Sequence, residues 1–298
     1  MGQPAILPAA RPATTSSISP SRDRLKALVV PREHGAWGLL LMPLLVGGLA
    51  GLRFDGEIEP VLILMGGALS LFWLRAPVES LLGTSPMYAH PGEERRQVLR
   101  MILITGLIAL LFLGALFWDG KNQALLPLGV AAAIMLAAQA VLKKLGRATR
   151  MASQIVGALG LTVTAPASYY VSTGNLDERA FGLWLATFLF VANQIHFVQL
   201  RIHGAKLIAA KDRIRQGAGF IAGELLILAA LAVAVRSGWL TALSSLAFLP
   251  AIFRGTAWFF RKPQPISVRR LGWSEVLQSI LFGALLLFGV YNGAFRLR

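Results

Sequence analysis

Charged and amide side chains interrupt long apolar stretches at only a few places, and these residues are the candidates for chemistry. The stretch "PREHGAWG" sets Arg32, Glu33 and His34 directly before an apolar run, and "WLRAPVES" brings Arg75 and Glu79 to the end of another. Ionisable groups in membrane-spanning helices are costly, and they usually lie in the bundle interior or in a wet cavity. Both stretches are therefore candidate walls of a site.

Two further stretches carry polar groups into apolar surroundings: "ANQIHFVQLRIHG", with Asn193, His196 and Arg201, and "GFIAGELL", with Glu224. A carboxylate can act as a general base, and imidazole can pass a proton because it titrates close to neutral pH. The predicted catalytic residues are Glu79, His196, Glu224 and His34. The predicted substrate-binding residues are Arg32, Arg75, Asn193, Lys143, Lys144 and Arg201, and the predicted metal ligands are Glu33 and Glu79.

Structural roles compete with these functional ones. Arg32 also fits a cytoplasmic anchor of the first helix, since basic residues gather on that side. Arg75 and Glu79 are four residues apart and are spaced to pair with each other on one helix. His196 and Glu224 also suit a hydrogen bond between neighbouring helices. The sequence leaves these alternatives open.

Structural roles also suit other polar residues near the same ends. Ser274 and Glu275 in "RRLGWSEV" resemble an ordinary helix start. Glu33 suits a first helical turn, where the helix dipole favours an acid. His203 is interpreted as a solvated residue.

The composition defines the environment. The chain has 298 residues, of which 55% are hydrophobic and 14% charged, whereas a soluble domain has about 25% charged residues. The net charge of +15 does not indicate nucleic-acid binding, because the basic residues form short clusters between apolar runs. The chain has no cysteine, which excludes thiolate metal sites.

Nine apolar runs approach the roughly 20 residues that a spanning helix needs. Residues 1–25 are rich in Pro, Ser, Ala and Arg and lack a signal-peptide pattern, so they are predicted to be a disordered cytoplasmic tail. Residues 26–298 are predicted to form a single multi-pass domain. The predicted spans are 35–52, 59–82, 99–118, 123–142, 152–173, 180–200, 217–236, 239–254 and 275–293.

The basic residues set the predicted orientation. Most of the 29 lysines and arginines fall in alternate connections, and each intervening loop has at most one. The positive-inside rule therefore places the N-terminus in the cytoplasm and the C-terminus outside. The predicted fold is an all-α bundle of about nine transmembrane helices, with the candidate site residues at the cytoplasmic ends of the spans.

Three stretches resemble a known family: "PREHGAWGLLLMPLLVG", "TAPASYY" and "RRLGWSEV" are similar to sequences of the YwiC-like bacterial membrane proteins. The function of that family is uncharacterised. The resemblance implies a multi-pass protein of the bacterial cytoplasmic membrane, with the lipid bilayer as its surroundings.

More distantly, the layout resembles the UbiA superfamily of intramembrane prenyltransferases, which have nine helices around a cavity open to the cytoplasm. The stretch "AVLKKLGRATRMASQIVGALGL" is similar to the link between their fourth and fifth helices, at Lys143, Lys144, Gln154 and Gly157. This resemblance implies an isoprenoid or anionic lipid ligand, and Mg²⁺ as a possible cofactor.

The chain departs from that superfamily at its two aspartate-rich motifs, which hold Mg²⁺ on a diphosphate. The second span ends with Glu79 alone, and after the sixth no aspartate occurs until Asp212. Three explanations stay open. The fold has kept its cavity and changed its chemistry, or Glu33, Glu79 and Glu224 supply oxygen ligands from new positions. In the third, arginine and lysine hold the diphosphate without a metal.

Three functions are compatible with these residues. The first is a prenyltransferase-like enzyme acting on an isoprenoid or related lipid. The second is a carrier of a small anionic or lipid-like ligand, for which Pro166 and Pro250 would break helices. The third is a haem-binding subunit that uses a pair among His34, His196 and His203. The sequence does not determine the substrate or the oligomeric state.

Overall fold

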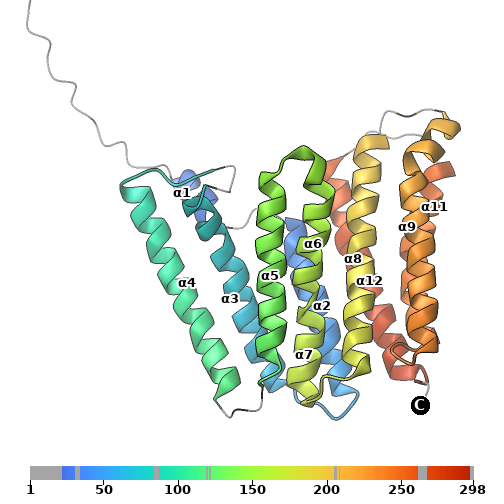
Figure 1. The fold of residues 1–298 in the computed structure, drawn as a ribbon, viewed down its shortest axis with the longest axis horizontal. Helices are drawn as coiled ribbons and strands as arrows, with labels where there is room; N and C mark the ends of the chain where they lie inside the picture. The colour runs from blue at the N-terminus through green and yellow to red at the C-terminus, as the bar shows by residue number, and fades with distance from the viewer. Residues whose placement is uncertain are drawn as a thin grey trace, which may run out of the picture.

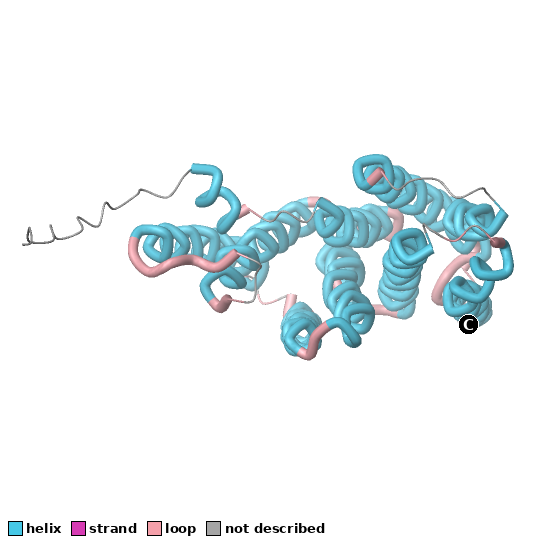
Figure 2. The backbone as a smooth tube through the Cα atoms, turned by 90° about the horizontal axis from the view of Figure 1, so that it is seen from above, coloured by secondary structure: helices cyan, strands magenta, loops and turns pink. Residues whose placement is uncertain are grey.

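The structure is a computed structural model, and it describes residues 22–30, 34–83, 87–118, 120, 122–204, 207, 209–260 and 267–295. All regular structure in these residues is helical, and the helices stand side by side in an elongated bundle (Figure 1). The view from above shows the same elongated outline (Figure 2). The helices are α1 (Arg22–Val29), α2 (His34–Leu52), α3 (Glu59–Leu81), α4 (Glu93–Phe117), α5 (Leu125–Lys144), α6 (Arg150–Thr162), α7 (Thr164–Thr173), α8 (Glu178–Gly204), α9 (Ala210–Arg236), α10 (Ala242–Ser245), α11 (Leu249–Phe260) and α12 (Val268–Asn292), with 3₁₀ turns at Arg147–Thr149 and Leu246–Phe248.

The described residues contain eight helices that are long and apolar enough to cross a membrane, counting α6 with α7 as one and α10 through α11 as one. The predicted first span is α2, whose apolar part, Trp37–Leu52, is shorter than these. A helix is present at each of the nine predicted spans. The chain is therefore a multi-pass helical protein with the composition of a membrane protein.

The predicted span limits agree with the observed helix limits at one end of the bundle and differ from them at the other. Helix α4 begins at residue 93 instead of 99, α9 at 210 instead of 217 and α12 at 268 instead of 275, while α11 continues to 260 instead of 254. All four differences lie at the end drawn uppermost in Figure 1. Here the helices continue as polar turns beyond the apolar run, so hydropathy marked the end of the run and not the end of the helix.

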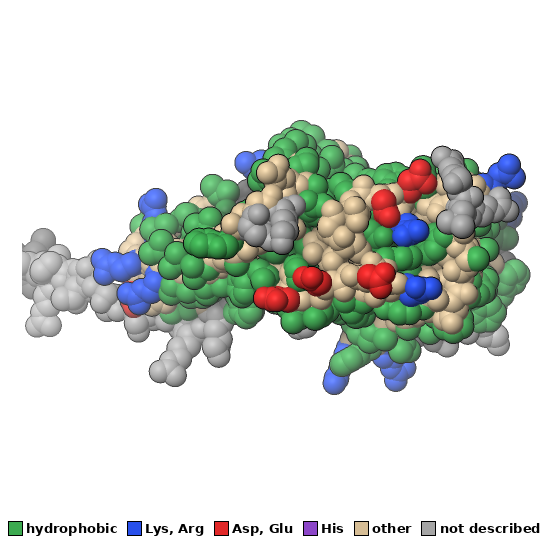
Figure 3. Space-filling model, turned by 90° about the horizontal axis from the view of Figure 1, so that it is seen from below, with side chains coloured by type: hydrophobic (Ala, Val, Ile, Leu, Met, Phe, Trp, Pro, Cys, Tyr) green, Lys and Arg blue, Asp and Glu red, His purple; other side chains and the backbone are tan. Residues whose placement is uncertain are grey.

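The two ends of the bundle differ in charge, and we refer to them as the basic end and the acidic end. The basic end, uppermost in Figure 1, carries the starts of α4, α9 and α12 and the end of α8. The opposite end presents several acidic side chains (Figure 3). These acidic residues lie in or beside the α2–α3 and α7–α8 connections: Asp55, Glu57, Glu59, Asp177 and Glu178. The start of α2 and the end of α12 lie at opposite ends of the bundle (Figure 1).

The core is centred on α7 and α8, while α4 and α5 are peripheral. All residues of α7 from Ala165 to Ser172 are buried, and the Phe190 and Phe282 rings stack with their centroids 3.9 Å apart. Helix α2 approaches α7 closely at Gly47, where a Cβ atom would lie 2.0 Å from the carbonyl oxygen of Ala165. Small residues permit such contacts between membrane helices. By contrast, only 17% of the apolar window of α4 and 6% of that of α5 is buried, which leaves both helices for lipid.

Both prolines that were predicted to break helices lie beside interruptions. Helices α6 and α7 are separated at Val163, three residues before Pro166, and a 3₁₀ turn separates α10 from α11 just before Pro250. Proline has no N–H and clashes with the carbonyl four residues earlier, which is Thr162 in the first case and Leu246 in the second. The helices are therefore interrupted at the two positions that the carrier hypothesis named.

The N-terminal segment is more structured than predicted within the part that the structure describes. Residues 1–21 of the predicted disordered tail lie outside the described residues, but residues 22–25 belong to α1. Arg24 Nε donates to Glu94 Oε1 on α4 at 2.5 Å, and this bond raises the pKa of the Arg24 guanidinium. Leu28 is buried. The tail boundary at residue 25 therefore falls inside a helix that packs on α3 and α4.

Candidate functional site

Helix α8 carries two amide side chains that are almost fully buried. Asn193 and Gln194 are 4% and 6% exposed and lie in the middle third of the helix. A buried amide needs hydrogen-bond partners, because an unpaired polar group in an apolar interior costs free energy. The two amides find these partners on α9 and α11, and the second partner, Arg254, bonds a carboxylate on α12. We define the α8 network as Asn193, Gln194, Glu224, Arg254 and Glu275.

Asn193 joins α8 to α9. Its Nδ2 donates to Glu224 Oε1 at 2.6 Å. Helix α11 approaches the same carboxylate at Gly255, where a Cβ atom would lie 3.2 Å from Glu224 Oε1 and 2.7 Å from the Phe220 ring. The absence of a side chain at Gly255 therefore makes room for Glu224 and Phe220.

Gln194 joins α8 to α11 and, through Arg254, to α12. Arg254 Nη1 donates to Glu275 Oε1 at 2.8 Å, and Nη2 lies 3.3 Å from Oε2 of the same carboxylate. Nη2 also donates to Gln194 Oε1. The guanidinium carbon lies 4.1 Å from the centroid of the Phe197 ring, which is cation–π geometry. Two-point pairing of this kind fixes both the position and the plane of the guanidinium.

Four polar atoms of the α8 network are buried and have no hydrogen-bond partner among the described residues. They are Asn193 Oδ1, Gln194 Nε2, Glu224 Oε2 and Arg254 Nε. Two of these atoms accept hydrogen bonds and two donate. Buried polar groups are normally paired, so the network offers open positions to water or to a polar group of a ligand.

A second polar group joins α3 to α5, and we call it the α3–α5 cluster: Arg75, Glu79 and Lys143. Arg75 Nε donates to Glu79 Oε1 at 2.8 Å, so the pairing predicted from their spacing is confirmed. Lys143 Nζ lies 3.6 Å from the same oxygen. The side chains are between 20% and 39% exposed. Two cations thus share one carboxylate, which leaves a positive charge within reach of solvent.

His196 lies on the α9 side of α8. Cβ positions built on Gly219 and Gly223 lie 3.9 Å and 3.4 Å from its ring, and the Phe220 ring centroid is 5.4 Å away. Within the described residues its ring nitrogens make no hydrogen bond.

Three residues further along α8, Gln199 Nε2 donates to Gln154 Oε1 on α6 at 3.0 Å. Polar side chains of α8 therefore reach α6, α9 and α11 within two helical turns.

The remaining predicted residues are placed as follows. Arg32 and Glu33 lie outside the described residues, and for His34 only the backbone, at the start of α2, is described. Lys144 is exposed at the end of α5, and Arg201 is half-buried near the end of α8. Of the predicted set, the structure brings together Arg75, Glu79 and Lys143, and separately Asn193 and Glu224.

Sequence reasoning omitted Gln194, Arg254 and Glu275 from the predicted site. Arg254 was assigned to the basic loop after a span ending at 254, but it lies inside α11, six residues before the helix ends. Glu275 was interpreted as a helix start, but it lies seven residues into α12. The available signal was Arg254 itself, an arginine with apolar neighbours on both sides that needs a partner.

The described residues do not fit a resident Mg²⁺ centre. They contain no group of three or more His, Asp or Glu residues placed to hold a metal ion. Glu79 is already paired with two cations and Glu275 with Arg254, whereas Mg²⁺ requires several free oxygen ligands. Glu33, the other predicted ligand, lies outside the described residues.

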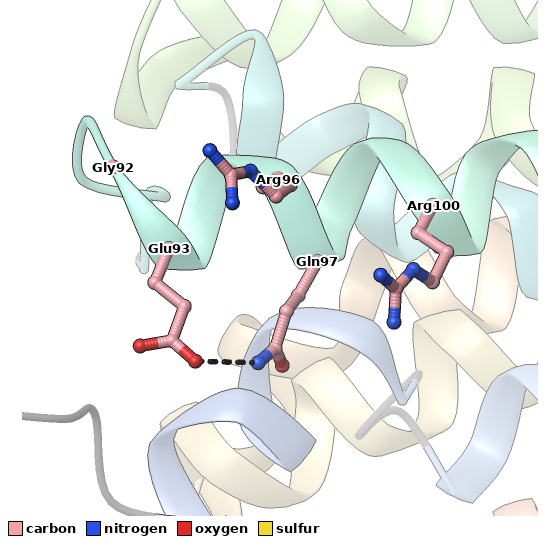
Figure 4. A pocket seen from close by; sticks show the side chains of 5 residues that line it. All are labelled: Gly92, Glu93, Arg96, Gln97 and Arg100. Atoms are coloured by element: carbon pink, nitrogen blue, oxygen red, sulfur yellow. Dashed lines mark hydrogen bonds between the residues drawn. The ribbon is translucent and has the colours of Figure 1, made fainter.

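A surface depression of about 380 Å³ lies on α4, at the basic end (Figure 4). It is lined by one turn of loop and helix: Gly92, Glu93, Arg96, Gln97 and Arg100. Gln97 Nε2 donates to Glu93 Oε1 at 3.3 Å. The depression is open to the surroundings and shares no lining residue with the α8 network or the α3–α5 cluster.

The helices and the buried polar side chains are those of a multi-pass membrane protein with an internal polar site. Residues 30–169 match the family model described as "YwiC-like protein". The chain is 26% identical over 269 residues to the "Uncharacterized protein YwiC" of Bacillus subtilis (strain 168), covering 88% of this chain and 98% of that protein. An alignment that covers 88% of this chain must include α8 and α9, whichever residue it begins at. No solved structure matches the chain.

Proposed function

We propose that this chain is a YwiC-like protein of the bacterial cytoplasmic membrane that binds an isoprenoid or another lipid with an anionic head group. In this proposal it acts on the lipid as a prenyltransferase-like enzyme, with the basic end of the bundle in the cytoplasm. The observation that carries the proposal is the α8 network, in which four unpartnered polar atoms are buried among membrane helices. Polar groups at membrane depth usually mark a functional site.

The two polar groups suit different parts of such a ligand. The α3–α5 cluster has more positive than negative charge, so Arg75 and Lys143, with Arg32, Lys144 and Arg201, are proposed to hold the anionic head. The α8 network has two carboxylates and one guanidinium, so it would repel an anion. Glu224 is proposed as a general base and Asn193 as the residue that orients it, at 2.6 Å.

The remaining predicted roles stay proposals. His196 and His34 are proposed to pass protons, and Glu79 to position Arg75 and Lys143. The UbiA resemblance implies Mg²⁺, but the described carboxylates do not fit it. We therefore propose that lysine and arginine hold the head group directly, and the experiment below measures any requirement for Mg²⁺.

A carrier is the second candidate, and a specific observation favours it. Helix α6 breaks from α7 near the middle of the segment Arg150–Thr173, and α10 breaks from α11. Discontinuous helices form the ligand sites of many secondary transporters. Uptake of a labelled lipid diphosphate by vesicles containing the protein, compared with empty vesicles, would favour the carrier over the enzyme.

The first experiment is thermal unfolding of the purified full-length protein with a non-hydrolysable prenyl diphosphate analogue, with and without Mg²⁺. A ligand at 100 times its Kd stabilises the folded state by about 2.7 kcal/mol. We expect the unfolding temperature to rise without Mg²⁺, and this rise to be lost in Arg75→Gln/Lys143→Gln. The matched control is Arg269→Gln/Arg270→Gln, which removes two exposed charges at the same end on α12. An unchanged unfolding temperature at saturating analogue would contradict a prenyl diphosphate ligand.

A further inference from the structure

The depression on α4 is part of a longer stripe along one face of the helix. Five residues follow one another at spacings of three or four, so they share that face: Arg96, Arg100, Leu103, Leu107 and Leu110. The three leucines are 72%, 57% and 66% exposed. We call these five residues the α4 stripe.

The opposite face of α4 is the one that packs against the protein. Its buried residues follow a spacing of four or seven: Glu94, Val98, Thr105, Ala109 and Leu116. They face α3 and α1, the helices with which α4 has its contacts. The α4 stripe therefore points away from the bundle, toward the surrounding lipid.

The length of the α4 stripe matches one leaflet of a bilayer. Ten residues separate Arg100 from Leu110, which is about 15 Å at the rise of an α-helix. Half of a typical hydrocarbon core is also about 15 Å. An acyl chain lying along the three leucines would thus bring its head group to Arg96 and Arg100, where the depression lies (Figure 4).

The charge of the depression selects the head group. Arg96 and Arg100 contribute two positive charges and Glu93 one negative charge, and the Glu93 carboxylate is held by Gln97. The lining is therefore net positive by one charge, which complements a phosphodiester with one net negative charge and not a zwitterionic head group.

We propose that the α4 stripe is a binding site for an anionic phospholipid of the leaflet at the basic end, with its phosphate in the depression between Arg96 and Arg100. The site is distinct from the α8 network and the α3–α5 cluster. The proposal does not depend on the proposed function, since it needs neither an internal site nor a reaction.

The test is native mass spectrometry of the full-length protein in detergent, titrated with phosphatidylglycerol or phosphatidylcholine. We expect phosphatidylglycerol to bind in preference, and Arg96→Gln/Arg100→Gln to weaken it about thirtyfold, since each basic residue contributes several-fold near a membrane surface. The matched control, Arg269→Gln/Arg270→Gln, removes two exposed charges at the same end and should bind as the wild type does. Glu93→Gln should bind more tightly.

Three results would overturn the proposal. They are equal binding of the two lipids, an equal loss in both double variants, and displacement of the lipid by inorganic phosphate at the same concentration. The second would indicate charge attraction without a site, and the third a site for free anions. Because Arg96 and Arg100 are exposed, we expect unchanged thermal unfolding in their double variant, which separates loss of binding from loss of folding.

Discussion

The α3–α5 cluster and the α8 network both place charged side chains among apolar helices, but they differ in exposure and in net charge. In the cluster, Arg75, Glu79 and Lys143 are partly exposed and carry excess positive charge. In the network, Arg254 bonds the Gln194 amide and the Glu275 carboxylate, and the two amides of the network are only 4% and 6% exposed. The cluster suits an incoming anion, whereas the network holds four helices together around unfilled polar positions.

Removing Arg254 is expected to have the largest effect on stability. Arg254→Ala leaves the Glu275 carboxylate, whose side chain is 20% exposed, without its cation and takes away the partner of Gln194. Breaking a fully buried pair costs about 3–5 kcal/mol, so this partly exposed pair is expected to cost about 3 kcal/mol or less. The free energy of unfolding in detergent measures the effect, and Arg75→Ala is the control, with an expected loss of about 1 kcal/mol or less. Equal losses of unfolding free energy in the two variants would show that the α8 network does not contribute more to stability than the α3–α5 cluster.

Filling the space at Gly255 is expected to have the next largest effect. Gly255→Ala places a Cβ atom 2.7 Å from the Phe220 ring and 3.2 Å from Glu224 Oε1, so these side chains or α11 itself must shift. Overpacking of this kind costs about 1–3 kcal/mol. In the control, Gly114→Ala on α4, the added atom meets nothing within 4 Å, and helix propensity favours alanine by about 1 kcal/mol. Thermal unfolding should shift in opposite directions in the two variants.

The bond between Asn193 and Glu224 can be measured by a double-mutant cycle. The cycle combines Asn193→Leu with Glu224→Gln. We expect a coupling free energy of about 0.6 kcal/mol and at most about 1.7 kcal/mol, as for other polar pairs in membrane helices. Combining Asn193→Leu with Glu79→Gln should give no coupling, because Asn193 and Glu79 belong to different groups. Significant coupling in that second cycle would indicate that the cluster and the network act as one site.

The smallest expected effect is the response of the α3–α5 cluster to salt. Its side chains are partly exposed, so raising the ionic strength from 0.1 M to 1 M screens the Arg75–Glu79 pair. The free energy of unfolding lost in Glu79→Gln should therefore shrink by a few tenths of a kcal/mol at high salt. The loss in Glu275→Gln should change less, because the Arg254–Glu275 pair is less exposed, at 16% and 20%, than the Arg75–Glu79 pair, at 20% and 30%. Equal salt dependence would mean that water reaches both groups alike.

At the acidic end of the bundle, the helix limits were predictable because each helix ends where its apolar run ends. The predicted limits 52, 59, 173 and 236 agree with the ends of α2, α3, α7 and α9. At the basic end the same rule failed, since α9 starts seven residues and α12 seven residues before the apolar run. Hydropathy measures transfer into lipid and carries no information about helical turns in the polar zone.

The sequence by itself determined the class of protein, the order of the apolar helices along the chain, the prolines beside the two helix interruptions and the pairing of Arg75 with Glu79. Each of these depends on local hydropathy, on backbone chemistry or on a spacing of four residues. Only the tertiary structure decided that Arg254 joins Gln194 to Glu275 and that Asn193 meets Glu224. Those partners are between 21 and 60 residues apart, so their contact depends on which helices pack together, and no local pattern encodes that.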